Sequence, residues 1–183
     1  MVKPTQTTPG MATIDDLFAL LDSFNIPTKT HFHQPVKTVD ENRDLRGALP
    51  GAHCKTLFLK DKKEIYWLCA MEETVRLNIR ALSDLLGSAR LSFARPERVR
   101  SKLGVEPGAI SPFALINNPQ NDINMIFDAT LMAAKVVNFH PLVNDRTTAI
   151  NPNDLVVFLQ ALGHRPVDID LASNTDKKNN KQT

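Results

Sequence analysis

Apolar and polar positions along the chain mark out short strands separated by polar turns. The run His53–Lys60 is dominated by Thr, Phe and Leu, and the run Ile65–Ala70 is apolar at almost every position. Unbroken apolar runs of this length are typical of strands that are buried on both faces. We therefore expect two central strands that pair across the polar turn at 61–63.

Helical spacing of apolar residues recurs elsewhere, with recognisable end signals. Thr13 can cap a first helix, Asn78 a second and Asn151 the last, while Pro96 suits the first turn of a third. Residues 36–45 fit a short charged helix or a loop. Further short strands are expected in six segments, 28–33, 90–94, 114–116, 123–127, 136–139 and 146–150. This mixture predicts a single α/β domain with a mixed, mostly antiparallel sheet covered by helices.

The composition agrees with an ordinary globular protein. Of the 183 residues, 42% are hydrophobic and 23% are charged. We expect a disordered N-terminal lead over 1–12, one domain over 13–170 and a disordered polar tail over 171–183. The net charge of +2 argues against affinity that rests on a large basic patch, but it allows modest contact with a polyanion.

The expected location follows from what the sequence lacks. No apolar run reaches the roughly 18 residues that a membrane span needs, and the first residues lack the apolar core of a signal peptide. We therefore expect a cytoplasmic protein that makes no contact with a membrane. Cys54 and Cys69 lie in the two central runs, where they could face each other, and we expect buried free thiols.

Lys55 is the unusual residue of the first central strand. Because side chains alternate along a strand, Lys55 shares a face with Leu57 and Leu59. An ammonium group in apolar surroundings needs an anionic partner or a cavity that admits one. Two interpretations stay open at this point. The lysine is solvated or paired with an internal carboxylate, or it is a cleft lysine that meets a phosphate or carbonyl of a substrate.

The common catalytic motifs are absent. The sequence has no nucleophile elbow, no phosphate-binding glycine loop and no zinc-ligand spacing, so we expect neither a metal nor a cofactor. His31 and His33 share a face of the expected first strand, but no cluster of further ligands follows them. His53 and Cys54 are adjacent on a strand and therefore point to opposite faces, which argues against a nucleophile–base pair.

Two other sites remain candidates. The loop Gly108-Ala109-Ile110-Ser111-Pro112 can present backbone N–H groups to a carbonyl oxygen or phosphate, or it is a plain tight connector. His140, which precedes a proline, is either a functional imidazole or a structural hydrogen-bonding group.

Four segments, in this order, resemble the YbaK-like aminoacyl-tRNA deacylase superfamily. They are His53–Asp61, Arg90–Ala94, Gly108–Phe113 and Asn138–Leu142. The resemblance covers about residues 13–165 and is to the freestanding prolyl-tRNA synthetase-associated branch, the trans-editing Ala-tRNA(Pro) deacylases. It implies a mixed sheet sandwiched by helices.

The resemblance also implies a reaction, hydrolysis of the ester of tRNA(Pro) wrongly charged with alanine. Lys55 falls on the family's lysine, whose implied role is to hold the terminal adenosine phosphate or the ester carbonyl. The loop Gly108–Pro112 is implied to line the aminoacyl pocket, with His140 near it. In this family a water attacks, positioned partly by the 2′-OH of the substrate, which is mainly catalysis by positioning.

Thr56 is a departure from the alanine-specific branch, which commonly has Asn after the lysine. Thr at this position occurs in the cysteinyl-specific and synthetase-inserted branches, so a deacylase for Cys or Ser stays an alternative. We count Thr56 among the expected substrate-binding residues. A pocket too tight for the proline ring would refuse the cognate amino acid, and Phe32, Val36 and Leu45 are expected to wall it.

The expected partner is mischarged tRNA(Pro). Because the net charge is small, help from prolyl-tRNA synthetase or an elongation factor is an additional expectation. A hypothesis of a different class also stays open, that the chain is a non-catalytic module that binds tRNA or a synthetase.

Overall fold

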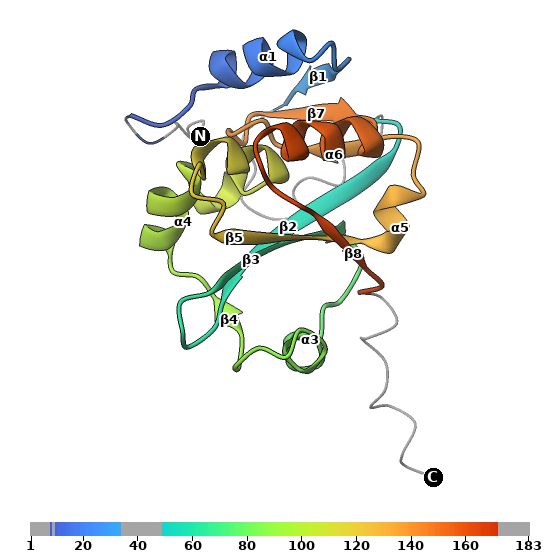
Figure 1. Cartoon of the computed structure of the whole chain (residues 1–183). Helices are drawn as coiled ribbons and strands as arrows, with labels where there is room; N and C mark the ends of the chain where they lie inside the picture. The colour runs from blue at the N-terminus through green and yellow to red at the C-terminus, as the bar shows by residue number, and fades with distance from the viewer. Residues whose placement is uncertain (1–7, 9, 34–48, 172–183) are drawn as a thin grey trace.

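A computed structural model describes residue 8 and residues 10–33 and 49–171 of the chain. Within these residues eight strands form one mixed sheet in the order β1-β7-β6-β2-β3-β5-β8, and β4 lies beside β2 (Figure 1). The expectation of a single α/β domain built on a mixed sheet is confirmed. The expected helix or loop at 36–45 lies outside the described residues. The strands are β1 (Lys29–Phe32), β2 (Ala52–Lys60), β3 (Tyr66–Glu72), β4 (Ser92–Phe93), β5 (Ile123–Asp128), β6 (Val137–Phe139), β7 (Arg146–Ile150) and β8 (Val167–Ile169).

Strand direction in the sheet is mixed, with antiparallel pairs in the majority. The pairs β1–β7, β2–β3, β2–β4 and β6–β7 are antiparallel. The pairs β2–β6, β3–β5 and β5–β8 are parallel. Because β6 follows β2 by a long stretch of chain, the parallel β2–β6 pair joins two segments that are far apart in the sequence.

The helices begin where the sequence supplies a cap. Thr13 Oγ1 accepts a hydrogen bond from the Asp16 N–H at 3.2 Å, and Asn78 Oδ1 accepts one from the Ala81 N–H at 3.0 Å. These caps confirm the predicted starts. The helices are α1 (Ile14–Ser23), α3 (Ile79–Leu85), α4 (Pro96–Leu103), α5 (Ala129–Met132) and α6 (Pro152–Ala161), with 3₁₀ turns η1 (Pro107–Ala109) and η2 (Pro112–Asn117).

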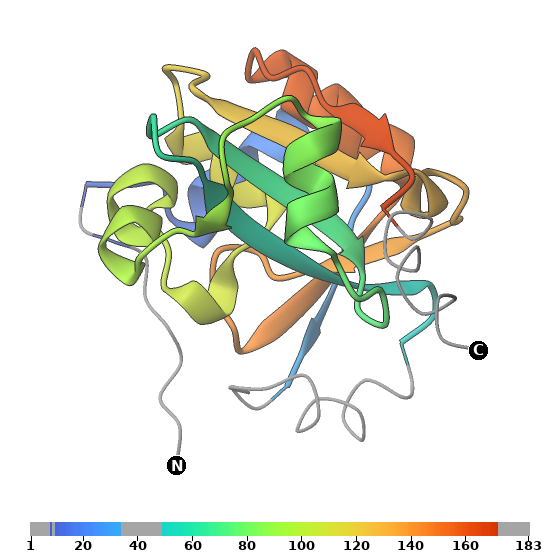
Figure 2. The same ribbon diagram turned by 90° about the horizontal axis from the view of Figure 1, so that it is seen from below.

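The two faces of the sheet carry separate hydrophobic clusters. One cluster joins buried residues of the sheet to α1, α4, α6 and η2, and it includes Phe58, Phe113 and Phe158. The other joins Leu59 and Met71 to Leu82 of α3 and its surroundings. Figures 1 and 2 show α3 alone against its face of β2 and β3, with α4 and α6 on the other side.

The structure departs from the sequence interpretation in three places. The strand expected at 114–116 is part of η2, because Pro112 fixes a turn and the Ala114 N–H donates to the Ser111 carbonyl. Strand β8 was not predicted, because its residues are mostly exposed and it is held by main-chain pairing with β5, which no apolar run signals. Cys54 and Cys69 are free but do not face each other, since Cys54 pairs with Glu72 and Cys69 with Leu57.

Candidate functional site

Lys55 lies in the middle of the sheet, on the face that α3 covers. Alternation along β2 places it with Leu57 and Leu59, and both leucines pack in the cluster around α3. The sequence predicted this shared face. The lysine is half-buried, so its charged group must find partners within the protein or a ligand.

The Lys55 ammonium finds main-chain oxygens. Its Nζ donates to the carbonyl of Glu73 at 2.9 Å and to the carbonyl of Val75. Burial lowers the pKa of Lys55 below its usual 10.5, the nearby Glu73 charge opposes this shift, and Arg76 adds to it. The sequence interpretations were a solvated or carboxylate-paired lysine and a lysine that meets a substrate, and the structure shows an ammonium held by main-chain carbonyl groups just before α3.

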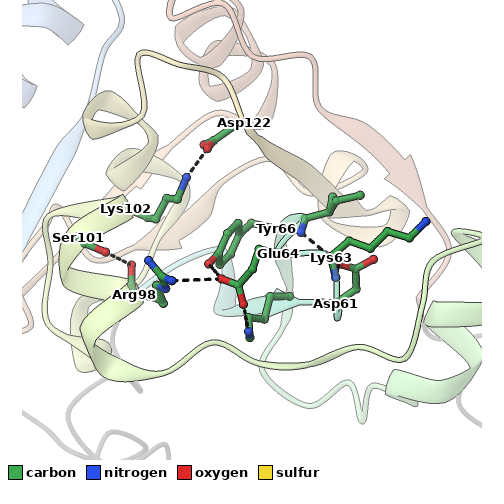
Figure 3. Close-up of polar contacts among 10 residues, drawn as sticks. Asp61, Lys63, Glu64, Tyr66, Arg98, Ser101, Lys102 and Asp122 are labelled. Atoms are coloured by element: carbon green, nitrogen blue, oxygen red, sulfur yellow. Dashed lines mark hydrogen bonds and ion pairs between the residues drawn. The ribbon is translucent and has the colours of Figure 1, made fainter.

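At the turn of the β2–β3 hairpin, the end away from Lys55, carboxylates form ion pairs with the nearby cations. Glu64 contacts Lys60, Tyr66 and Arg98, as Figure 3 shows. Lys102 of α4 pairs with Asp122 in the same way. Lys55 differs from these cations because no described carboxylate bonds to its ammonium.

His140 lies at the end of β6, in a small hollow beside the start of β2. The hollow is lined by His53 and Cys54 from β2, by His140 and by Thr147 from β7, among others. His140 Nδ1 is 2.8 Å from the carbonyl of Arg146, which fixes the ring. The parallel register pairs Ala52 with Val137 and His53 with Asn138, so the start of β2 lies beside the strand that leads to His140.

The loop Gly108–Pro112 includes the last two residues of η1 and ends at the first residue of η2. Ala109 is buried in the cluster on the face opposite α3, and Ile110 packs against that cluster. A Cβ placed on Gly108 would lie 3.6 Å from the side-chain nitrogen of Asn144, in the connection between β6 and β7. The loop is therefore adjacent to the segment that follows His140.

Buried oxygens that have no hydrogen-bond partner among the described residues lie in these same segments. They are Thr56 Oγ1 on β2, Ser111 Oγ in the loop and Asn138 Oδ1 on β6. Buried polar groups are nearly always satisfied, so each such atom needs an explanation such as a ligand. Sequence reasoning did not single out Asn138, although it stands in the segment that carried the resemblance.

The structure links some of the predicted residues more closely than others. The loop lies against the β6–β7 connection, and His140 lies against the start of β2. Lys55 does not line the hollow at His140, and its ammonium turns toward the chain that enters α3.

His33 is a residue whose position the sequence did not explain. Its ring lies 5.7 Å from that of His140, and its Nε2 is 2.9 Å from Thr147 Oγ1. The only signal in the sequence was the His31–His33 pair, which was considered as a metal ligand. Within the described residues no three His, Cys, Asp or Glu side chains gather as a metal site would require.

The pocket walls proposed from the sequence are partly visible. Phe32 is 75% exposed, with the Arg146 guanidinium 4.6 Å from its ring centre. Val36 and Leu45 lie outside the described residues. No helix in the described part of the chain is both long enough and apolar enough to span a bilayer.

Comparison with known proteins adds an independent observation. Residues 33–158 match the family model described as "Aminoacyl-tRNA editing domain". The chain is 36% identical over 159 residues to the prolyl-tRNA synthetase associated domain-containing protein 1 of Xenopus laevis, covering 84% of this chain and 94% of that protein. It is 30% identical over 156 residues to the prolyl-tRNA editing protein ProX of Acetoanaerobium sticklandii, covering 85% of this chain and 95% of that protein.

A solved structure also has the same fold. It is described as a candidate trans-editing enzyme for prolyl tRNA synthetase, and it superposes with a TM-score of 0.63 over 85% of this chain and 94% of that chain. At 21% identity the likeness supports the fold alone.

Proposed function

The chain belongs to the family of aminoacyl-tRNA editing domains, and from that premise we propose that it hydrolyses the ester of mischarged tRNA(Pro) in trans. The proposed substrate carries alanine. A water attacks the ester carbonyl, the bond to the ribose oxygen breaks, and free alanine and tRNA with an intact 3′ end are released. The substrate's own 2′-OH helps to position the water, so the protein acts mainly through orientation and charge.

The arrangement around Lys55 carries this proposal. An ammonium group has three donors, and two of them bond to the carbonyls of Glu73 and Val75. The remaining donor is available to the ester carbonyl or to the phosphate of the terminal adenosine. Because no carboxylate bonds to the ammonium within the described residues, its charge stays available to stabilise a developing oxyanion.

The loop and His140 are assigned to the proposed site by the family resemblance, while the loop packs on the sheet face opposite to the one that carries Lys55. The loop Gly108–Pro112 would line the pocket for the amino acid, with the unpartnered Ser111 hydroxyl as a polar group in its wall. Thr56 would be the polar residue next to Lys55, and His140 would contact the substrate near the same pocket. A substrate would supply the partners that the buried oxygens of Thr56 and Ser111 lack.

The expected partner follows from the reaction. The substrate is a tRNA used in translation, so the proposal places the protein in the cytoplasm. Because the net charge is only +2, prolyl-tRNA synthetase or an elongation factor is proposed to deliver the mischarged tRNA.

The test of the proposed chemistry compares two lysines of the same strand. Lys55→Ala should reduce the initial rate of Ala-tRNA(Pro) hydrolysis by about two orders of magnitude or more, as loss of one oxyanion donor does in other enzymes. Lys60→Ala is the matched control, because Lys60 ends β2 at the surface and pairs with Glu64. Its rate should stay near that of the unaltered protein.

A panel of charged tRNAs separates the amino-acid alternatives. Thr56 leaves Cys and Ser as competing substrates, so initial rates should be measured for Ala-, Cys-, Ser- and Pro-tRNA(Pro). Alanine should be released fastest and proline not at all. Binding of tRNA without cleavage of any ester would reject the enzyme and favour a tRNA-binding module.

A further inference from the structure

A second hollow, lined by both apolar and charged residues, opens on the α3 side of the sheet, away from the loop and His140. It has a volume of about 590 Å³ and lies between α3 and the segment that leads to β4. Arg80 and Asp84 line it from α3, and Arg90 lines it from the following segment. Figure 2 shows α3 exposed across β2 and β3 on this side.

The walls of this hollow are fixed by hydrogen bonds. Ser83 Oγ donates to the Ile79 carbonyl at 2.9 Å and accepts from the Leu91 N–H at 3.1 Å. Ser88 Oγ donates to the Ala89 carbonyl at 3.0 Å. The backbone that carries Arg80 and Arg90 is therefore held in place before any ligand arrives.

The two arginines of the hollow, like the exposed Arg76, Arg95 and Arg165, differ from the paired arginines of the protein. Both are exposed, and neither guanidinium makes an ion pair or hydrogen bond within the described part of the chain. By contrast, Arg100 pairs with Glu106 and Arg146 with Asp145. Asp84 is the sole acidic residue among those that line the hollow. Two unpaired guanidinium groups in a preformed hollow are suited to phosphate groups.

An exposed aromatic residue, Phe93, follows two residues after Leu91, which lines the hollow. Phe93 pairs with Leu59 across the antiparallel β2–β4 ladder, so both side chains project to the α3 side. Leu59 is fully buried there, whereas Phe93 is 59% exposed. A solvent-exposed ring on the same face as arginines is a combination that can stack on unpaired bases and contact their phosphates.

The position of this surface relative to Lys55 indicates its ligand. Lys55 lies on the same face of β2, four residues before Leu59, which is about 13 Å along a strand. The Val75 carbonyl that holds the Lys55 ammonium lies three residues before the Asn78 cap of α3. An RNA strand whose end is held at Lys55 would reach the hollow within a few nucleotides.

From this geometry we propose that Arg80, Arg90 and Phe93 bind the single-stranded 3′ end of the tRNA substrate, with the arginines on its phosphates and the ring on one unpaired base. This inference rests on the proposed function, since it assigns a surface to the same substrate. It explains how a chain with a net charge of only +2 concentrates positive charge where the RNA lies.

The test measures binding of an uncharged tRNA(Pro) minihelix with its single-stranded 3′ end, by fluorescence anisotropy over a range of salt concentrations. The double variant Arg80→Gln, Arg90→Gln should bind at least tenfold more weakly, with a salt slope smaller by about 1 per arginine. Phe93→Ala should bind about tenfold more weakly with an unchanged salt slope, because stacking releases no counterion. Arg165→Gln is the control, since Arg165 is an exposed arginine between α6 and β8, and its variant should match the unaltered protein.

Two results would reject the assignment of this surface to RNA binding. If the double variant keeps the affinity and salt slope of the unaltered protein, or if the unaltered protein does not bind the minihelix, the assignment of this surface is rejected. Thermal unfolding of each variant verifies that the fold is intact. Failure of the proposed function looks different, because arginine-dependent RNA binding would persist while no charged tRNA is hydrolysed.

Discussion

The hydroxyl of Thr56 illustrates what one residue contributes at the proposed site. Its Oγ1 is buried on the face of β2 opposite to Lys55 and has no hydrogen-bond partner among the described residues. A hydroxyl that is satisfied only by a ligand contributes nothing to folding in the free protein, because burial costs free energy that no internal bond returns. Folding therefore does not require a hydroxyl at position 56, and its proposed role is to bind the substrate.

Thr56→Val tests this directly, because valine has nearly the same shape without the hydroxyl. The free energy of unfolding should change by less than about 1 kcal/mol or increase, while hydrolysis of the preferred charged tRNA slows. Urea unfolding and initial rates provide the two measurements.

A second threonine provides the matched control. Thr148 is fully buried, and its Oγ1 lies 2.9 Å from Thr30 Oγ1, so Thr148→Val removes a hydrogen bond and should cost about 1–3 kcal/mol. Equal destabilisation by the two variants would mean that the Thr56 hydroxyl has an internal partner after all.

At the scale of elements, the β2–β3 hairpin separates a paired end from the end that carries Lys55. Near its turn, Glu64 forms ion pairs with Lys60 and Arg98 and accepts a hydrogen bond from the hydroxyl of Tyr66 (Figure 3). Along the strands, Tyr66 pairs with Lys60 and Met71 pairs with Lys55. The hairpin therefore holds both lysines rigidly but gives them different partners.

The single tyrosine of the chain reports on the paired end. Burial, followed by the hydrogen bond to Glu64, raises the pKa of Tyr66 to about 12. A phenol with a raised pKa stays protonated in the folded protein after the unfolded chain has begun to ionise. Stability from this group is therefore complete below about pH 10 and is lost as the pH rises toward about 12.

Ultraviolet titration of the tyrosine tests this assignment. Glu64→Gln should lower the pKa of Tyr66 from its value in the unaltered protein but leave it above 10, since burial is the larger cause. If the unaltered protein titrates at pH 10, the phenol is not buried as described.

Most elements followed from local patterns. The caps at Thr13, Asn78 and Asn151 and the proline that opens α4 placed four helices at their observed starts. Segment 114–116 was taken for a strand because consecutive apolar residues do not distinguish a strand from a buried turn. Strand β8 was missed because it is stabilised by pairing with β5, which lies far away in the sequence.

At the scale of the whole molecule, one buried histidine couples stability to pH. His164 follows α6, is 3% exposed, and lies against the main chain of Leu115 and Ile123. Burial lowers the pKa of His164 below 6.5, and the nearby main-chain groups oppose the shift. The unfolded chain takes up this proton first, so the stability that the neutral imidazole provides is lost as the pH falls below about 6.5.

Unfolding by urea at a series of pH values from 8 to 5 measures this coupling. The unaltered protein should lose stability with falling pH more steeply than His164→Gln, which has no ionisable group there. The difference in free energy of unfolding between the two proteins at pH 8 is the reference, because the imidazole is neutral there in both the folded and the unfolded state. Parallel curves over the whole range would show that His164 does not couple folding to protons in this way.

The sequence by itself determined the positions of most strands and helices, the shared face of Lys55, Leu57 and Leu59, and the family resemblance. These features are local, since they depend on alternation, capping and residue order within short segments. Only the tertiary structure decided that carbonyls hold Lys55, that the loop touches the connection after His140, and that His33 lies beside His140. It also decided that Arg80, Arg90 and Phe93 share a face with Lys55. Such contacts depend on which strands pair across the sheet, and no pattern within a short segment specifies a partner far away in the chain.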